Sequence, residues 1–205
     1  MRIFALIPAA GRSRRMRAHK LLLDVGGRPV IDHLVTALAH AADEVFLLRR
    51  SDDLELRQAL AVHPEVHVVE AQTDPPEMRD SVQLLLNDVS RTCRPTDDDG
   101  WLLCPADHPV IRRNVVETLV RAFRERPQAM HLPTHDDRNG HPLLIPWSLA
   151  SRVRELPLNV GLNALKRLPG VEVVRHPVQD PSVLWDLDTP DDYQRLLTTL
   201  EIGHE

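Results

Sequence analysis

The 205-residue sequence is poor in cysteine and in aromatic side chains, and it contains no long hydrophobic run. Its two cysteines, Cys93 and Cys104, are too few for a disulfide framework and lack the spacing of a zinc site. No apolar stretch approaches the ~18 residues that a membrane helix needs, so we expect no membrane contact. The apolar run over residues 2–7 is too short for a signal peptide, and the basic cluster follows it instead of preceding it. These absences favour a cytoplasmic protein.

The net charge and the scarcity of aromatic residues argue against a protein that binds nucleic acids. The formal net charge is -5 and only 3% of the residues are aromatic, whereas a general nucleic-acid binder is basic. We therefore expect no nucleic-acid partner.

Lysine is scarcer than arginine throughout: only two of the 25 basic residues are lysines, Lys20 and Lys166. A lysine at position 20, in a chain that nearly always has arginine, indicates that this position needs the compact ammonium group and not a guanidinium.

Apolar segments alternate with amphipathic segments as far as residue 126. The pattern predicts strands over 2–7, 44–50, 66–70 and 101–105, and helices over 29–42, 53–61, 78–89 and 112–126. Such alternation is typical of an α/β fold, a Rossmann-like and mainly parallel sheet flanked by helices, here in one domain. The pattern is less regular after residue 127, where we expect an antiparallel strand or a small lid. The segments expected there are strands over 129–133, 141–146 and 171–176, short helices near 147–155 and 159–168, and a closing helix over 191–200.

Basic residues gather directly after the first expected strand, in "IPAAGRSRRMRAHK" over residues 7–20. Ligands of a parallel α/β sheet bind beyond the carboxyl ends of the strands, which is where this segment lies. Gly11 would let the backbone turn and approach a ligand closely, and backbone N–H groups in such turns bind anions. The segment therefore predicts a polyphosphate site, with a surface loop of solvated arginines as the alternative. The glycine patterns of P-loop enzymes and of dinucleotide-binding domains are both absent.

This segment resembles the signature of sugar-nucleotide and cofactor nucleotidyltransferases, roughly L-A-A-G-x-S-x-R-M-G-x-x-K. Four further segments support the resemblance in the same order: "EMRDSVQLLL" from 77, "PADHP" from 105, "NGHPLLIP" from 139 and "WDLDTPDDY" from 185. Together they make most of the chain similar to the MobA-like NTP transferase family. Within that family the molybdenum cofactor cytidylyltransferase branch is most similar. The resemblance implies the nucleotide-diphospho-sugar transferase, or GT-A-like, form of the fold.

The resemblance implies roles for the residues of the basic loop. Arg15 and Lys20 would act in catalysis by neutralising the negative charge of the phosphates. Binding of the nucleotide would involve Ala9, Ala10, Gly11, Arg12, Ser13 and, near the base, Ser81. A methyl group at Ala10 narrows the pocket against a purine, which favours CTP as the substrate. Arg17 and His19 stand where the family usually has glycine and proline.

The resemblance also implies a magnesium site. Mg²⁺ takes oxygen ligands and is usually held by one or two carboxylates together with phosphates. Asp107 of "PADHP", which also has a catalytic role, and Asp188 of "WDLDTP" would bind the metal. Asp188 could instead cap the closing helix, for which Thr189 is a competing cap. We expect Asp186 to be structural and Asp97–Asp99 to form a solvated loop.

On the acceptor side, the matching residues are His108, Gly140 and His141. An acceptor phosphate is already ionised, so no protein nucleophile is required and catalysis consists of positioning and charge neutralisation. The main hypothesis is transfer of CMP from CTP to molybdopterin or a similar phosphorylated acceptor, with a molybdoenzyme or its chaperone as partner protein. One alternative is another nucleotide with a sugar or alcohol phosphate. The other is a non-catalytic chaperone that binds a nucleotide or a cofactor.

Overall fold

A computed structural model of the chain describes residues 1–12, 16, 18–157 and 160–202. Its main sheet contains β1 (Ile3–Pro8), β4 (Glu44–Arg50), β5 (Val66–Ala71), β6 (Gly100–Leu103), β7 (Met130–His135), β8 (Arg138–Asn139), β9 (Leu143–Pro146) and β10 (Val173–Pro177). The strand order is β10-β7-β9-β6-β1-β4-β5, with β8 paired to β7. A separate small ribbon joins β2 (Asp24–Val25) to β3 (Arg28–Pro29).

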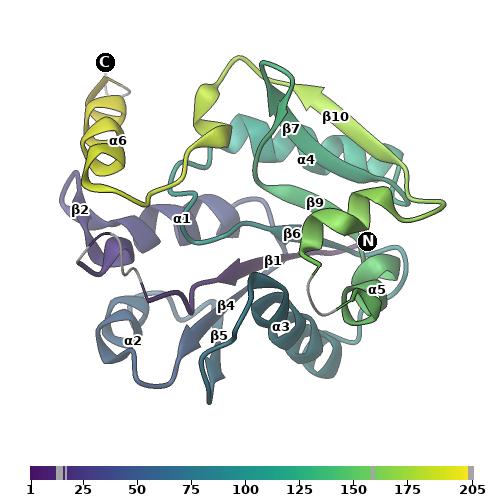
Figure 1. Ribbon diagram of the computed structural model, residues 1–205, viewed down its shortest axis with the longest axis horizontal. Helices are drawn as coiled ribbons and strands as arrows, with labels where there is room; N and C mark the ends of the chain where they lie inside the picture. Colours follow the sequence, from purple (N-terminus) through teal and green to yellow (C-terminus); the bar gives the residue numbers. More distant parts are fainter. Residues whose placement is uncertain (13–15, 17, 158–159, 203–205) are drawn as a thin grey trace.

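The direction of the strands matches the expected fold class. Strands β6, β1, β4 and β5 are parallel neighbours. Strand β9 runs antiparallel between β6 and β7, and β10 is parallel to β7. The prediction of a mainly parallel α/β sheet with an antiparallel strand after residue 127 is confirmed. Figure 1 shows this one sheet crossing the molecule.

Helices cover both faces of the sheet (Figure 1). They are α1 (Val30–Ala39), α2 (Leu54–Leu60), α3 (Met78–Cys93), α4 (Arg113–Glu125), α5 (Ala150–Glu155) and α6 (Pro190–Ile202), with single-turn or short 3₁₀ helices η1 (Lys20–Leu22), η2 (Trp147–Leu149), η3 (Leu162–Arg167) and η4 (Pro181–Leu184). Among the described residues, no helix has the length and apolar character that crossing a membrane requires.

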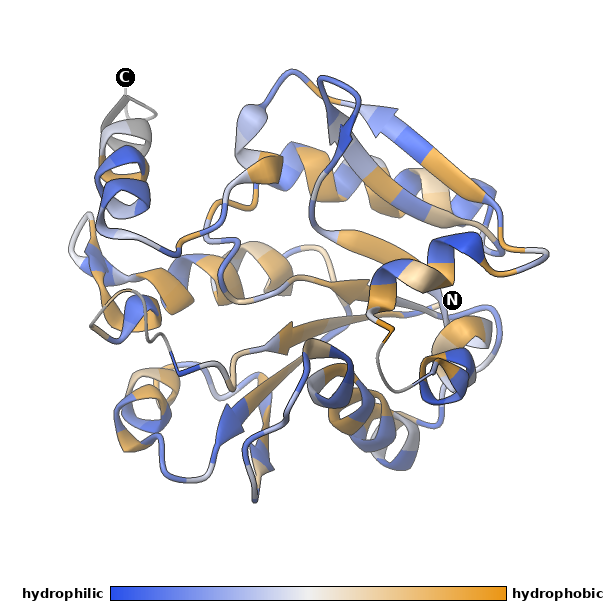
Figure 2. Cartoon of the chain, in the orientation of Figure 1, coloured by the Kyte–Doolittle hydropathy of each residue, from blue (hydrophilic) through white to orange (hydrophobic). Residues whose placement is uncertain are grey.

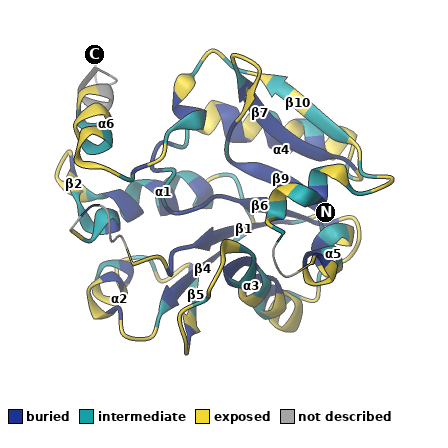
Figure 3. Cartoon of the chain, in the orientation of Figure 1, coloured by how far each residue is buried: buried dark blue, intermediate teal, exposed yellow. Residues whose placement is uncertain are grey.

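Side chains of β1 alternate between two hydrophobic cores because successive residues of a strand point to opposite faces. Ile3, Ala5 and Ile7 pack with α1 and α4, whereas Phe4 and Leu6 pack with α3 and α5. The strand is therefore apolar throughout, as expected for a strand covered on both faces. Figure 2 shows the apolar strands and inward helix faces, and Figure 3 shows the same central elements buried.

The structure differs from three predictions near the edges of the fold: in the end of α3, in the type of one short helix and in the burial of Asp99. Helix α3 continues to Cys93, and Arg94 ends it with a left-handed backbone (φ 48°), just before Pro95. The helix expected over 159–168 is a 3₁₀ helix, η3. Asp99 is not solvated: it is 2% exposed and accepts hydrogen bonds from the backbone N–H groups of Arg2 at 2.6 Å and Thr96 at 2.9 Å. Asp99 thus ties the N-terminus to the start of β6.

Candidate active site

A pocket of about 250 Å³ opens where β1 and β6 end. Its walls are residues 8–11 at the end of β1, Lys20 and Leu21 of η1, residues 75–78 and Ser81 around the start of α3, and Ala106 and Asp107 after β6. Six predicted site residues therefore lie around one cavity: Ala9, Ala10, Gly11, Lys20, Ser81 and Asp107. The parallel arrangement of β1 and β6 brings their carboxyl ends to the same edge, which is why these separate segments meet.

Two carboxylates converge on the ammonium group of Lys20. The Nζ atom donates to Asp188 Oδ1 at 3.2 Å and to Asp107 Oδ2 at 3.4 Å. The three side chains are only partly exposed, at 13% for Lys20, 31% for Asp107 and 24% for Asp188. Two carboxylates facing one cation are a donor set that suits a divalent metal such as Mg²⁺. The residues predicted to hold the metal are thus brought together.

The segment before α6 positions Asp188. The backbone N–H of Leu187 donates to the Asp107 carbonyl at 2.7 Å, which joins this segment to the end of β6. Asp192 caps the helix, because its Oδ2 accepts from the N–H groups of Asp188 at 3.1 Å and Thr189 at 2.8 Å. The Thr189 hydroxyl also accepts from Asp192 N at 3.3 Å. Thr189 and Asp192 perform the capping, and the Asp188 carboxylate reaches Lys20.

The glycine turn is held by a residue that the sequence analysis missed. Arg50 Nη1 donates to the carbonyl oxygens of Ala10 at 3.3 Å and Gly11 at 2.9 Å. The pairing of β1 with β4 explains this contact. Pro8 pairs with Leu48, and Ala10 and Arg50 each lie two residues further along the chain, so they come to lie side by side. Gly11 has no positive φ, so the turn does not depend on a left-handed backbone at this residue. An added Cβ at Gly11 would meet no described atom within 4 Å, so its small size keeps the pocket wall open.

Arg12 follows Gly11, the last residue of this segment that lines the pocket, and two carboxylates bind its side chain. Its Nη2 donates to Asp74 at 3.0 Å and to Asp52 at 3.1 Å, and all three side chains are exposed. The hydrogen bond to Asp74, followed by that to Asp52, raises the pKa of Arg12 above its ordinary value. A phosphate would therefore have to compete with these carboxylates for Arg12. Ser13 and Arg15 lie outside the described residues.

His19, which replaces the usual proline, has a specific partner. Its Nε2 lies 3.0 Å from both carboxylate oxygens of Asp53. Asp53 is 4% exposed, accepts from Leu56 N at the start of α2, and pairs with Arg50 at 2.9 Å. The histidine therefore connects the end of the basic loop to the group that holds the glycine turn. Arg17, the other departure from the family pattern, lies outside the described residues.

Two histidines and a carboxylate extend the site beyond Asp107. His108 Nε2 lies 2.9 Å from Asp186 Oδ1, and the rings of His108 and His141 are 4.2 Å apart at their centroids. The hydrogen bond from His108 holds the pKa of Asp186 below its usual value, and burial lowers the pKa of His141 to about 3. Ligand atoms of Asp107, His108 and Asp186 lie within 4.8 Å of one another, a second arrangement that could hold a metal ion. Asp186, predicted to be structural, belongs to this cluster.

Gly140 contributes to the site through its size. A Cβ atom added to it would lie 2.5 Å from the carbonyl oxygen of Val183, which is closer than real side chains approach. The next residue, His141, donates its backbone N–H to the same carbonyl at 2.8 Å. Gly140 therefore allows the chain after β8 to pack against η4 and place His141 beside His108. Its direct contact with an acceptor stays a prediction.

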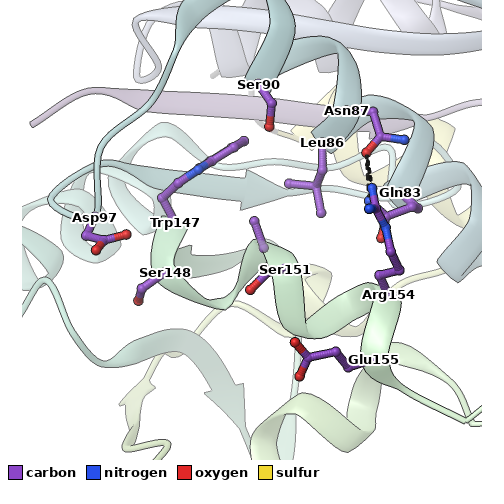
Figure 4. Close-up of a pocket in the computed structure, with 11 residues that line it drawn as sticks. Gln83, Leu86, Asn87, Ser90, Asp97, Trp147, Ser148, Ser151, Arg154 and Glu155 are labelled. Atoms are coloured by element: carbon purple, nitrogen blue, oxygen red, sulfur yellow. Dashed lines mark hydrogen bonds between the residues drawn. The ribbon is translucent and has the colours of Figure 1, made fainter.

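A larger pocket, of about 440 Å³, lies away from this site (Figure 4). It is lined by α3, η2 and α5, with the Trp147 ring on one side and Asn87 accepting from Arg154 at 3.0 Å on the other. Asp97, which also lines it, precedes β6, so this pocket opens near the amino end of that strand. The residues predicted from the sequence lie at the carboxyl end instead.

A mainly parallel sheet, with a glycine turn after its first strand and carboxylates at the same edge, defines a nucleotide-binding α/β domain. The MobA-like NTP transferase domain matches residues 5–176, and the chain belongs to this family of nucleotidyltransferases. The family predicted from the five sequence segments is confirmed.

The chain is also similar to individual members of this fold. It is 26% identical over 199 residues to a 2-C-methyl-D-erythritol 4-phosphate cytidylyltransferase of Alteromonas mediterranea, covering 86% of this chain and 82% of the relative. The crystal structure of Rv0371c from Mycobacterium tuberculosis H37Rv is similar with a TM-score of 0.78 and 24% identity, covering 97% of this chain and 99% of that one. A CMP:2-keto-3-deoxy-manno-octonic acid synthetase complexed with CTP has a TM-score of 0.76 and 16% identity, covering 99% and 100%. The two solved structures establish the fold.

Proposed function

We propose that the protein transfers CMP from CTP to a phosphorylated acceptor and releases pyrophosphate. The observation that carries this proposal is the position of Lys20 between Asp107 and Asp188, at the mouth of the pocket that the glycine turn encloses. Membership of a nucleotidyltransferase family and similarity to a named cytidylyltransferase support the same activity.

In this proposal, the chain's own residues position the substrates and neutralise charge. The cytosine ring lies against Ala10 and Ser81, and the triphosphate follows the turn at Gly11. Lys20 contacts the phosphates, where an ammonium group stabilises the charge that develops as pyrophosphate leaves. The acceptor phosphate, already ionised, attacks the α-phosphorus in line, so no side chain needs to act as nucleophile. Arg15 is proposed to assist Lys20.

Asp107 and Asp188 would hold a divalent cation, for which we propose Mg²⁺. When bound, the metal ion would neutralise phosphate charge and orient the reacting groups. Carboxylate oxygens suit both Mg²⁺ and Mn²⁺, and His108 would add a nitrogen ligand beside Asp107 and Asp186. Both ions should therefore be tested.

The acceptor side is formed by His108 and His141, with Gly140 setting the position of the latter. We propose molybdopterin as the acceptor, with a molybdoenzyme or its chaperone as the protein that receives the product in the cytoplasm. The Alteromonas relative is named for another phosphate monoester, 2-C-methyl-D-erythritol 4-phosphate. A phosphate monoester is the chemistry that both acceptors share.

Pyrophosphate release tests the activity. The protein is incubated with each of the four NTPs, with Mg²⁺ or Mn²⁺, and with molybdopterin, 2-C-methyl-D-erythritol 4-phosphate or simple sugar phosphates. Acceptor-dependent release is expected with CTP, and Ala10→Gly should shift the preference toward GTP by widening the pocket. Release with GTP in preference to CTP would contradict the assignment of the base. Binding of CTP without release on any acceptor would favour the non-catalytic alternative.

A further inference from the structure

Both ends of the basic loop are attached to one buried carboxylate, that of Asp53. At the end of the loop, His19 Nε2 lies 3.0 Å from each carboxylate oxygen of Asp53. At its start, Arg50 makes the connection, because its Nη2 donates to Asp53 Oδ2 at 2.9 Å and its Nη1 donates to the carbonyl oxygen of Gly11 at 2.9 Å. The positions of Gly11 and His19 are therefore both tied to the same group.

Asp53 is itself held firmly by the fold. It precedes the first residue of α2, where its Oδ1 accepts from the backbone N–H of Leu56 at 3.1 Å, and it is 4% exposed. Leu56 and Leu60 of this helix are buried in the hydrophobic core. A buried carboxylate is costly unless hydrogen-bond donors surround it, and here His19, Arg50 and Leu56 supply the donors. Asp53 thus gives the loop a rigid point of attachment.

The proposed catalytic lysine follows His19 directly. Lys20 begins the short helix η1, its ammonium group donates to Asp188 at 3.2 Å, and Lys20 and Gly11 line the same pocket. The spacing across this pocket, from the glycine turn to the ammonium group, therefore depends on how His19 is attached. A second support of η1 is Leu21, which is 3% exposed and packs in the core. The contributions of the two supports can be separated by substitution.

We propose that His19 and Asp53 are positioning residues for the phosphates of the nucleotide. By joining the two ends of the loop, they hold Lys20 at a fixed spacing from the glycine turn, so that a triphosphate binds without prior reorganisation of the loop. Neither residue is among the described residues that line the pocket, so each acts through Lys20 or the turn. The inference rests on the proposed function and deepens it, because it explains what places Lys20 against the phosphates.

The Lys20 ammonium can be observed directly in the protein without nucleotide. Reductive dimethylation with ¹³C-formaldehyde keeps the charge of each amine, and the two lysines give two side-chain NMR signals besides the N-terminus. Lys20→Arg identifies the Lys20 signal by its loss. His19→Ala should move this signal toward that of a freely mobile lysine. His19→Gln should restore most of the original position, because the glutamine amide can still donate to Asp53.

His67→Ala is the matched control. His67 also lies 3.0 Å from a carboxylate oxygen, that of Glu44. This pair lies at the other end of β4, because Glu44 begins the strand whereas Asp53 follows its last residue. The control should leave both the Lys20 signal and the binding of nucleotide unchanged.

Calorimetric titration with CTP and with cytidine separates positioning from general loosening of the fold. His19→Ala should raise the Kd for CTP about tenfold, the scale of one charge-assisted hydrogen bond. The Kd for cytidine should not change, because the nucleoside has no phosphates for Lys20 to contact. His19→Gln should bind CTP nearly as well as the unsubstituted protein.

A double-mutant cycle tests whether His19 acts through Asp53. Asp53→Asn keeps a side chain that can cap α2, but it removes the charge that holds His19 and Arg50. It should raise the Kd for CTP at least as much as His19→Ala does. In the Asp53→Asn protein, His19→Ala should add little, since both substitutions break the same contact. Fully additive effects would contradict the connection through Asp53.

A Lys20 signal that His19→Ala leaves in place would overturn the inference and assign the support of η1 to Leu21. Equal weakening of CTP and cytidine binding would also overturn it, because a role in folding alone affects both ligands. Movement of the signal in His19→Ala, together with CTP binding but no transfer to any acceptor, would count against the proposed function only. Transfer of CMP with an unmoved Lys20 signal in His19→Ala would count against this inference only.

Discussion

The Lys20 ammonium donates to the Asp188 carboxylate at 3.2 Å, across a sequence separation of 168 residues. The contact joins the basic loop after β1 to the segment that leads into α6, and Asp107 completes it from the end of β6. The first and last functional segments of the chain therefore meet at one cation. Each of the following predictions depends on this arrangement or on the groups that support it.

Replacement of Lys20 should impair catalysis more than folding. Lys20→Ala is expected to lower kcat by about 10²–10³, the usual effect of removing one preorganised stabiliser of developing charge. Lys20→Arg should recover only part of the loss, because a guanidinium has a different geometry from an ammonium. Steady-state kinetics with saturating CTP measure both effects. Full activity of Lys20→Ala would remove the catalytic role of the loop.

Asp188 and Asp192 should separate catalysis from helix capping. Asp188→Asn should reduce turnover by about 10²–10³ while leaving the melting temperature nearly unchanged, because it weakens the charge that faces the metal and Lys20. Asp192→Ala should instead lower the free energy of unfolding by about 1 kcal/mol, since it removes the carboxylate that accepts from the N–H groups of Asp188 and Thr189 before α6. Turnover and urea unfolding are measured on both variants. Near-normal turnover of Asp188→Asn would contradict the assignment of Asp188 to the metal.

Arg50 should control nucleotide affinity through the backbone. Arg50→Met removes the donor to the carbonyls of Ala10 and Gly11, so the turn should lose its fixed geometry. We expect the Kd for CTP to rise about tenfold, the scale of a charge-assisted hydrogen bond. Calorimetric titration well below the melting temperature measures this change. Arg57→Met, on the exposed side of α2, is the control and should bind CTP normally; an unchanged Kd in Arg50→Met would show that the turn needs no such support.

His141 should make the fold sensitive to mild acid. Burial lowers its pKa to about 3 in the folded protein, against about 6.5 in an unfolded chain. The unfolded state therefore binds more protons, and the stability due to neutral His141 is present above pH 6.5 and decreases as the pH falls toward 3. Between pH 6.5 and 5.5, His141→Gln should lose about 1 kcal/mol less unfolding free energy than the unsubstituted protein. Urea unfolding at the two pH values measures this, with exposed His40→Gln as the control; equal losses in all three proteins would place His141 in a solvated environment.

The sequence predicted the alternating elements well because their apolar periods are local. Strand β4 was predicted to the residue, and the strands around Ile3 and Val66 were predicted to within one residue at each end. The 3₁₀ character of η3 and the burial of Asp99 depend on tertiary contacts, which no local pattern contains. The same limit applies to Asp186, whose partner His108 lies on a different segment.

Sequence motifs predicted most of the candidate site. They identify the site residues but not the residues that hold those in position. The gathering of Lys20, Asp107 and Ser81 around one pocket agrees with the prediction. Arg50 was missed because its role requires the register of β1 against β4.

The fate of the α-phosphate tests the central claim most directly. The protein is incubated with CTP labelled at either the α- or the γ-phosphorus, a divalent metal ion and a phosphorylated acceptor, and the products are separated. Nucleotidyl transfer predicts the α-label in the acceptor product and the γ-label in pyrophosphate, with both lost in Asp107→Asn. Appearance of the γ-label in the acceptor, or as inorganic phosphate released from CTP, would contradict the account.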